Sequence, residues 1–171
     1  MEQVSGRPAE GDRLSGRSRT ITESDLVGFG SLTGDLHPQH VDGRWSESSA
    51  FGSRVAHGML VLSYSIGLIG FDPDRVVALR GLDSVRFKRP VRIGETISVE
   101  AVVREVAPLE PPLSLVSFAW TVSTAESGTV VKARVQALWR DPVTSATEPE
   151  PSRPPNVAAA EGSLYPDGVL L

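Results

Sequence analysis

The stretch VAHGMLVLSYSIGLIG, residues 55–70, decides the fold. Its length and composition predict one helix, and Ser63 and Ser65 provide almost the only polar surface along it. A helix that is apolar nearly all round is a buried helix. We therefore expect the rest of the chain to cover this helix on several sides.

Long β-strands that follow the helix can provide this cover. Apolar and polar side chains alternate along them, most clearly in the last strand, which is typical of a sheet with one buried face. The connections are short and turn-like, so successive strands should pair in an antiparallel meander. The predicted strands are residues 76–87, 96–106, 113–124 and 129–139. The expected fold class is α+β, with a long central helix wrapped by an antiparallel β-sheet.

The N-terminal part of the chain carries weaker signals. Thr22 is a good helix N-cap, Glu23 and Asp25 suit the positive end of a helix dipole, and Gly34 is a natural helix end. The predicted elements are a flexible segment at 1–16, a short strand at 17–21, a helix at 23–33 and a short helix at 44–50. The connection between residues 34 and 56 is long for a compact domain, and such connections are usually functional.

Composition bounds the class of protein. The 171 residues suffice for one domain with a core, and 40% hydrophobic and 22% charged residues are typical of soluble globular proteins. A formal net charge of -4 argues against binding to nucleic acid or to an acidic membrane. Cysteine is absent, which excludes disulfides and thiolate chemistry. No segment resembles a signal peptide or a membrane span, so we expect a cytoplasmic protein.

A change of composition marks the end of the domain. Six of the thirteen prolines lie at or after position 142, among serine, glutamate and alanine. Such a composition cannot bury enough apolar surface to order itself. We expect one domain at 17–142 and a mostly disordered tail at 143–171.

All three histidines lie in two short segments, GDLHPQH at 34–40 and AHGML at 56–60. Asp35 and His40 stand on either side of Pro38, so they cannot share one helical face, and only a turn can bring them together. A carboxylate and an imidazole around one water molecule form a proton-transfer pair. The simpler alternative makes Asp35 a turn former and His40 a loop residue bonded to the backbone.

Gly58 stands at the start of the apolar helix. A backbone N–H at a helix N-terminus can stabilise a developing negative charge, and glycine lets a substrate approach the backbone closely. This combination suits an enoyl thioester, whose hydration needs a base, an acid and a donor for the enolate oxygen.

Three segments together carry a resemblance: FGSLTGDLHPQHVD at 29–42, VAHGML at 55–60, and FKRPV at 87–91 followed by Gly94-Glu95. They resemble the MaoC-like family of (R)-specific enoyl-thioester hydratases and dehydratases, over roughly residues 18–140. The resemblance implies a hotdog fold, usually as a homodimer. It also implies an acyl thioester substrate on coenzyme A or acyl-carrier protein, no other cofactor and no metal. The family's catalytic aspartate falls on Asp35, its catalytic histidine on His40 and its oxyanion-binding amide on Gly58.

The chain departs from the family pattern at two positions. His37 occupies a place where the family usually has asparagine, and imidazole, unlike an amide, titrates. A helix serine that assists the family's site has Ser65 as its nearest candidate and Ser63 as a weaker one.

Other residues are candidates for substrate binding. His57 is expected to bond to backbone or to a partner subunit at the helix start, and it is kept among the substrate-binding candidates. Arg86 and Lys88 belong to a basic stretch that could meet the phosphates of coenzyme A or the acidic face of a carrier protein. The alternative is a strand edge kept soluble by charge. A metal site at Asp35, His37 and His40 is not favoured, because the spacing is not a common zinc pattern.

Three functions follow in order of preference. The first is reversible hydration of a 2-enoyl thioester. The second is a hotdog thioesterase, or an enzyme that adds a nucleophile other than water, which the histidine at position 37 suggests. The third is a non-catalytic subunit of a heterodimeric dehydratase, although the presence of Asp35, His40 and Gly58 in one chain argues against it.

Overall fold

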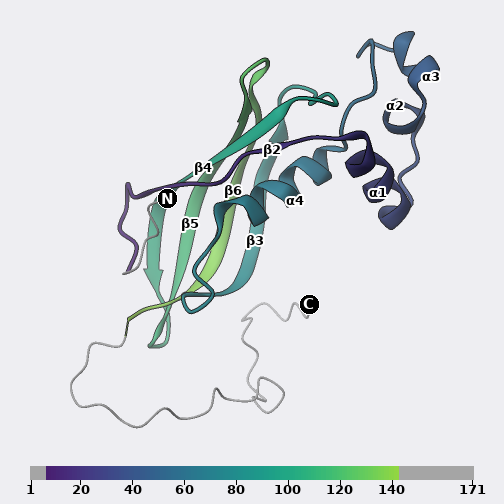
Figure 1. Ribbon diagram of the computed structural model, residues 1–171. Helices are drawn as coiled ribbons and strands as arrows, with labels where there is room; N and C mark the ends of the chain where they lie inside the picture. Colours follow the sequence, from purple (N-terminus) through teal and green to yellow (C-terminus); the bar gives the residue numbers. More distant parts are fainter. Residues whose placement is uncertain (1–6, 143–171) are drawn as a thin grey trace.

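The computed structural model describes residues 7–142. Its ten helices and strands form one α+β unit, with the helices α1–α3 gathered beyond one end of the sheet (Figure 1). The elements are β1 (Arg13–Ser15), β2 (Arg19–Thr20), α1 (Glu23–Thr33), α2 (Pro38–Val41), α3 (Gly43–Glu47), α4 (Gly58–Ile69), β3 (Val76–Phe87), β4 (Thr96–Pro108), β5 (Leu113–Thr124) and β6 (Gly128–Arg140). The predicted fold class is confirmed.

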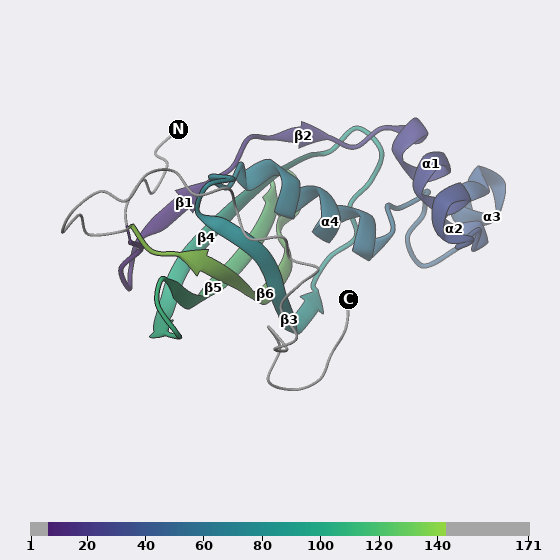
Figure 2. The ribbon, with the colours of Figure 1, turned by 90° about the horizontal axis from the view of Figure 1, so that it is seen from below.

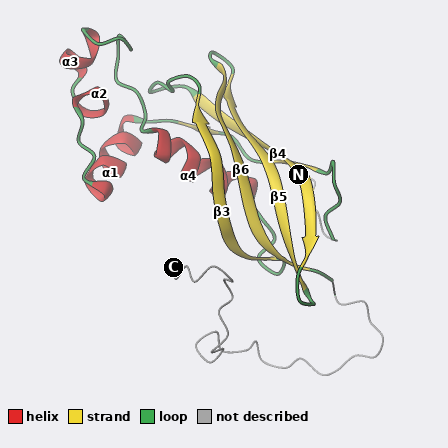
Figure 3. Cartoon of the chain, turned by 180° about the vertical axis from the view of Figure 1, so that it is seen from behind, coloured by secondary structure: helices red, strands yellow, loops and turns green. Residues whose placement is uncertain are grey.

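The sheet is antiparallel throughout, in the order β1-β4-β5-β6-β3, with β2 also paired to β4 (Figure 3). The prediction that each strand pairs with the next was wrong for β3, which lies beside β6 instead of β4. The reason is the segment between β3 and β4. Val91 accepts a hydrogen bond from Ala56 N–H (2.8 Å), and Gly94 N–H donates to Ile21 (2.8 Å). These bonds tie the segment to distant parts of the chain. The segment therefore runs from β3 at one edge of the sheet to β4 near the opposite edge, and it forms no hairpin.

Helix α4 lies against one face of the curved sheet (Figure 2). Its sheet-facing side buries Leu60, Val61, Leu62, Ser65 and Ile69. These residues join a core that the central strands supply, with Phe118 and Trp120 essentially inaccessible to solvent. Burial of this apolar surface is the main stabilising term of the domain.

The expectation that the chain covers α4 on several sides was only partly right. The N-terminal segment covers part of the helix, where Arg17 N–H donates to Leu68 C=O (2.9 Å). Met59, Ser63 and Gly67 nevertheless remain exposed, and Met59 is 50% exposed. These positions recur every four residues, so they form one stripe along the helix. A single sheet meets only one side of a helix, which is why this stripe stays uncovered in one chain.

The N-terminal prediction needs a correction. Residues 13–15 lie in the segment predicted to be flexible, but they form β1, which pairs with β4 and buries Leu14. Three residues carry no visible periodicity, and tertiary pairing alone makes them a strand. The short helix predicted at 44–50 ends earlier, at Glu47, and α2 was not predicted. The predicted tail at 143–171 lies outside the described residues. Within residues 7–142, no helix is both long and apolar enough to cross a membrane.

A buried hydrogen-bond chain joins α4 to the sheet. The indole N–H of Trp120 donates to Ser65 Oγ (2.8 Å), and this hydroxyl donates to Leu62 C=O (2.7 Å). We expect Ser65→Ala to lower the free energy of unfolding by about 1–3 kcal/mol, because it leaves a buried indole N–H without an acceptor. Urea unfolding at fixed protein concentration measures this loss.

Ser63→Ala is the matched control, since Ser63 is an exposed serine of the same helix. Both substitutions change helix propensity equally, and we expect Ser63→Ala to stay within about 0.5 kcal/mol of the parent. Equal unfolding free energies for the two variants would contradict a structural role of the Ser65 hydroxyl.

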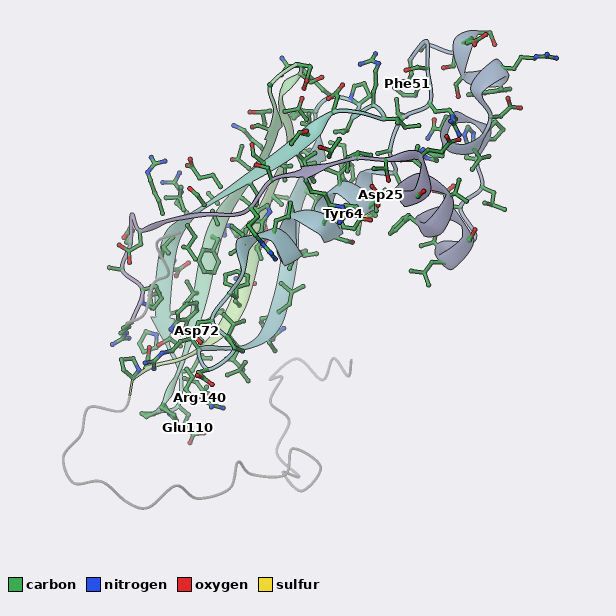
Figure 4. All side chains as sticks on the ribbon, viewed as in Figure 1. Asp25, Phe51, Tyr64, Asp72, Glu110 and Arg140 are labelled. Atoms are coloured by element: carbon green, nitrogen blue, oxygen red, sulfur yellow. The ribbon has the colours of Figure 1, made fainter. Side chains whose placement is uncertain are left out.

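A polar contact joins α4 to α1. Tyr64 Oη donates to Asp25 Oδ1 (2.6 Å), and Arg19 also donates to this carboxylate (2.7 Å). Figure 4 shows Tyr64 and Asp25 lying together where α4 meets α1. Thr22 and Asp25 also cap each other's backbone N–H at the start of α1. Burial alone would raise the pKa of Asp25, but the hydrogen bonds from Tyr64, Thr22 and Arg19 outweigh it and hold this pKa well below its usual value.

A lowered pKa makes this contact sensitive to acid. The ionised Asp25 stabilises the fold above the ordinary aspartate pKa of about 3.9, and this contribution is lost as the pH falls from there toward the lower folded pKa. We expect Tyr64→Phe to cost about 1.5–3 kcal/mol at pH 7. The difference from the parent should shrink below about pH 4. Urea unfolding from pH 7 to pH 3 tests this, and a cost that does not change with pH would contradict it.

Candidate active site

A cavity of about 620 Å³ opens where the N-terminus of α4 meets the loop that carries Asp35 and the far end of β3. Its walls are mainly apolar and include a few polar groups, which is typical of small-molecule sites. The lining residues are Phe29, Thr33, Asp35, Gln39, His40, Phe51, Val55, Ala56, His57, Gly58, Met59, Val61, Phe87, Lys88, Arg89, Pro90, Val91 and Val131.

His40 is buried on α2 and has a defined orientation. Its Nδ1 lies 2.7 Å from the carbonyl oxygen of Val55, so Nδ1 carries the proton and donates it. Its Nε2 lies 2.9 Å from the side-chain nitrogen of Gln39, which donates to the ring. Burial lowers the pKa of His40, the bond to Val55 opposes this effect, and the neighbouring His57 lowers the pKa further. The ring is therefore neutral near pH 7, and Nε2 is its unprotonated nitrogen, which accepts the hydrogen bond from Gln39.

Asp35 is held in the turn that ends α1. Gly34 ends the helix in the left-handed conformation (φ 80°), which glycine adopts without strain, and the chain reverses there. The Asp35 carboxylate is 52% exposed, and its Oδ2 lies 4.0 Å from His40 Nε2. One water molecule can lie within hydrogen-bonding distance of both atoms. The turn thus brings together the two side chains that the sequence paired, while their catalytic roles stay a prediction.

Gly58 is the first residue of α4. The first hydrogen bond within the helix runs from Val61 N–H to His57 C=O (3.2 Å), so the N–H of Gly58 has no helix carbonyl to donate to. A Cβ atom at position 58 would lie 2.8 Å from the ring of Phe87, closer than carbon atoms pack. Glycine is therefore required for the backbone to face the cavity beside Phe87.

His57 is 2% exposed and touches both members of the pair. Its Nε2 donates to the backbone carbonyl of Asp35 (2.9 Å), and its ring stacks on the His40 ring with centroids 3.7 Å apart. The expected bond to backbone is confirmed. The suggested contact with substrate stays a prediction, although His57 lines the cavity.

His37 does not line the cavity. Its Nδ1 accepts a hydrogen bond from Gln39 N–H (3.3 Å), which makes it the N-cap of α2. Its exposed ring packs edge-on against Trp45, with centroids 5.5 Å apart. An asparagine side chain can make the same cap, so the departure from the family pattern has a structural explanation.

Of the remaining candidates for substrate binding, only Lys88 lines the cavity. Ser65 lies in the core, accepts a hydrogen bond from Trp120 and does not line the cavity, so its suggested assistance to the site stays a prediction. Arg86 does not line the cavity, and its guanidinium donates to the carbonyl of Val85 (2.9 Å). Lys88 does line the cavity, together with its neighbour Arg89.

Sequence reasoning missed Gln39 and Phe87 as site residues. Gln39 binds the His40 ring through its side chain, and Phe87 lies against Gly58. The adjacency of Gln39 to His40 was the only signal for the first residue. The contact of Phe87 arises from tertiary packing between β3 and α4.

Asp35, His40 and His57 form a group that could also be considered for a metal, since one ligand atom from each lies within 4.8 Å of the others. Both ring Nε2 atoms already have partners, Gln39 Nε2 and Asp35 O. A metal would have to displace both bonds. In the described residues the group is therefore a hydrogen-bonded cluster.

Comparison with known proteins fits this geometry. A model of the MaoC like domain matches residues 5–114, more than half of the chain. The chain belongs to the MaoC-like family. Over 91 residues it is 34% identical to an (R)-specific enoyl-CoA hydratase of Rhodospirillum rubrum, a match that covers 53% of this chain and 63% of the hydratase. The matched region spans less than two thirds of the first curated relatives.

Solved structures agree on the fold. An Archaeoglobus protein described as a monoamine oxidase regulatory protein superposes with a TM-score of 0.74 at 34% identity, over 79% of this MaoC-like chain and 92% of that protein. A Mycobacterium tuberculosis protein described as a double hotdog fold superposes with a TM-score of 0.73 at 18% identity, over 86% of this chain and 48% of that one. The expected hotdog fold is confirmed.

The cap at position 37 yields a local prediction. His37→Asn should preserve the cap, whereas His37→Ala should cost about 1 kcal/mol in the first turn of α2. The amide of Gln39 should then exchange with deuterium roughly fivefold faster in His37→Ala than in the parent at pH 8. Protection in His37→Asn should equal that of the parent. Faster exchange in both variants would show that the imidazole does more than cap.

Proposed function

We propose that this MaoC-like chain is an (R)-specific hydratase/dehydratase of 2-enoyl and 3-hydroxyacyl thioesters. One observation carries the proposal: the Asp35 carboxylate and the neutral His40 ring meet at the wall of an apolar cavity, beside the N-terminus of α4. An acyl thioester needs this combination of an apolar pocket, an acid–base pair and a backbone donor. The hydratase activity named for the Rhodospirillum rubrum relative supports it.

In the hydration direction, one water molecule lies between Asp35 Oδ2 and His40 Nε2. His40 accepts a proton as the water oxygen bonds to the β-carbon of the enoyl group, and Asp35 stabilises the resulting imidazolium. The pair then delivers one proton to the α-carbon. The product gains one water, with hydroxyl on the β-carbon and hydrogen on the α-carbon. Dehydration follows the same steps in reverse.

The thioester oxygen gains negative charge while the β-carbon is attacked. Gly58 N–H, at the positive end of α4, is the donor that stabilises it. The glycine also leaves room for the thioester between the backbone and Phe87. In this proposal a backbone N–H stabilises the charge on the thioester oxygen, and side chains transfer the protons.

Lys88 and Arg89 line the same cavity as this site. Their charges suit the phosphates of coenzyme A, or the acidic face of an acyl-carrier protein, as the group that delivers the substrate. Arg89 is already oriented by hydrogen bonds to the carbonyls of Ser127 (2.8 Å) and Thr129 (3.3 Å). No further cofactor takes part in the proposed reaction.

The protein is proposed to act as a homodimer. Strand β3 is an edge strand of the described sheet, and it exposes Val77, Leu79, Leu82 and Phe87. A long apolar edge strand is a template for pairing with another strand. A second copy is the occupant that this edge suits, since the same edge on both copies can pair about a two-fold axis.

The other two candidate functions have less support. The imidazole at position 37, which suggested thioester hydrolysis or a nucleophile other than water, acts as a helix cap outside the cavity. A non-catalytic subunit has no need for Asp35, His40 and Gly58 around one cavity. Product analysis by mass spectrometry separates these cases, because hydration adds one water to an intact thioester.

Loss of either member of the pair should abolish the reaction. We expect Asp35→Asn and His40→Ala each to lower kcat for hydration of an enoyl-CoA by about 10²–10⁴-fold. Absorbance of the conjugated thioester follows the reaction. Asp74→Asn, at an exposed aspartate between α4 and β3, is the matched control and should retain full activity. An active Asp35→Asn/His40→Ala double variant would refute the proposal.

The pH dependence of the parent provides a second test. His40 must be neutral to act as a base, and burial lowers its pKa, so kcat/KM should be level near pH 7 and fall only at lower pH.

A further inference from the structure

We propose that His57 is a positioning residue that holds Asp35 and His40 in their working geometry. The inference rests on the proposed function and deepens it, because it explains how two groups from different elements keep a fixed separation. His57 stands between them, on neither the loop of Asp35 nor the helix of His40. It is the residue just before α4, a helix whose buried side chains belong to the core.

The first contact fixes the loop. His57 Nε2 donates to the backbone carbonyl of Asp35 at 2.9 Å, so the ring binds the main chain of the residue whose carboxylate reacts. Its Nε2 also lies 4.0 Å from Asp35 Oδ2. Gly30 of α1 allows this close approach, since a Cβ atom there would lie 3.1 Å from the same carbonyl oxygen. This hydrogen bond therefore ties the backbone of Asp35 to the start of α4.

The second contact fixes the ring of His40. The two imidazoles stack with centroids 3.7 Å apart and planes inclined by 24°, and Phe29 packs on His57 at 5.1 Å. The bond from His40 Nδ1 to Val55 leaves rotation about that bond open. A flat neighbour limits this rotation and keeps Nε2 at its distance of 4.0 Å from Asp35 Oδ2.

Ordinary structural roles do not account for His57. It stands at the N-cap position of α4, but its side chain makes no capping bond. Its Nδ1 is buried without a hydrogen-bond partner among the described residues. A buried polar atom without a partner costs free energy, so an apolar ring would pack here with less penalty. The imidazole is instead explained by the two contacts that it makes with the pair.

His57 also affects the pKa of His40, which a residue that only packs against the ring would not do through charge. The titratable or charged groups facing this part of the site are Asp35 and His37 from the loop, with Lys88 and Arg89 across the cavity. Among the neighbours of His40, His57 lowers the pKa of the ring and Asp35 raises it. Replacing His57 by an uncharged ring should therefore raise the pKa of His40.

Three variants separate the contacts. His57→Phe keeps a ring without the N–H, His57→Gln keeps a donor of similar reach without the ring, and His57→Ala removes both. We expect kcat for enoyl-CoA hydration to fall roughly tenfold in each of the first two and on the order of 10²-fold in His57→Ala, with KM within about threefold of the parent. His37→Asn is the matched control, because it also removes one histidine and should leave kcat unchanged.

An NMR titration of the histidine side chains provides a readout independent of turnover. The chain has only three histidines, so their signals can be assigned from single variants. In His57→Phe the titration of His40 should move to higher pH than in the parent, and in His37→Asn, which keeps the stacked pair, this shift should be smaller, because His37 lowers the pKa of His40 less than His57 does. Circular dichroism verifies that each variant is folded.

Two results would overturn the inference. One is parent-like kcat in both His57→Phe and His57→Gln. The other is an unchanged titration of His40 in folded His57→Phe. If the parent itself hydrates no enoyl thioester, the proposed function fails, yet the titration still decides whether His57 controls His40.

Discussion

The structure depends on the packing of α4 against the curved sheet. The helix buries one side on the central strands, and the hydrogen bond from Trp120 to Ser65 fixes its depth and rotation there. A helix fixed along its length has a fixed N-terminus. Every part of the candidate site is attached to that terminus, so the precision of the site derives from burial of apolar surface far from the chemistry.

The attachment is made mostly through backbone groups. Val55 C=O accepts a hydrogen bond from His40, Ala56 N–H donates to the carbonyl of Val91, and Gly58 lines the cavity. His57 adds its bond to the carbonyl of Asp35. Four successive residues thus place all parts of the site. Backbone anchors have no rotamers to lose, so they cost less entropy to hold than side-chain anchors would.

Local signals predicted the elements that local physics controls. The bounds of α1, β3 and β5 agree with the sequence prediction, because a helix cap or a run of alternating residues defines them. Strand order was missed for β3, since hydrogen bonds made by the segment after β3 determine it. The approach of Asp35 to His40 could be predicted because Pro38 prevents one helix from containing both residues, and in the structure Pro38 begins α2. The contacts of Ser65 could not, because nothing in the sequence shows which side of an all-apolar helix meets Trp120.

The uncovered stripe of α4 and the free edge of β3 meet at the site. Met59 on the helix and Phe87 at the end of β3 are each about half exposed, and both line the cavity. One chain therefore leaves an apolar wall of its own cavity open to water. Open water would weaken the electrostatic interactions on which acid–base and oxyanion catalysis depend. Pairing of β3 with a second copy would cover this wall and the helix stripe together. The proposed dimer and the proposed reaction are thus linked by one physical requirement, the exclusion of water from the acyl side of the site.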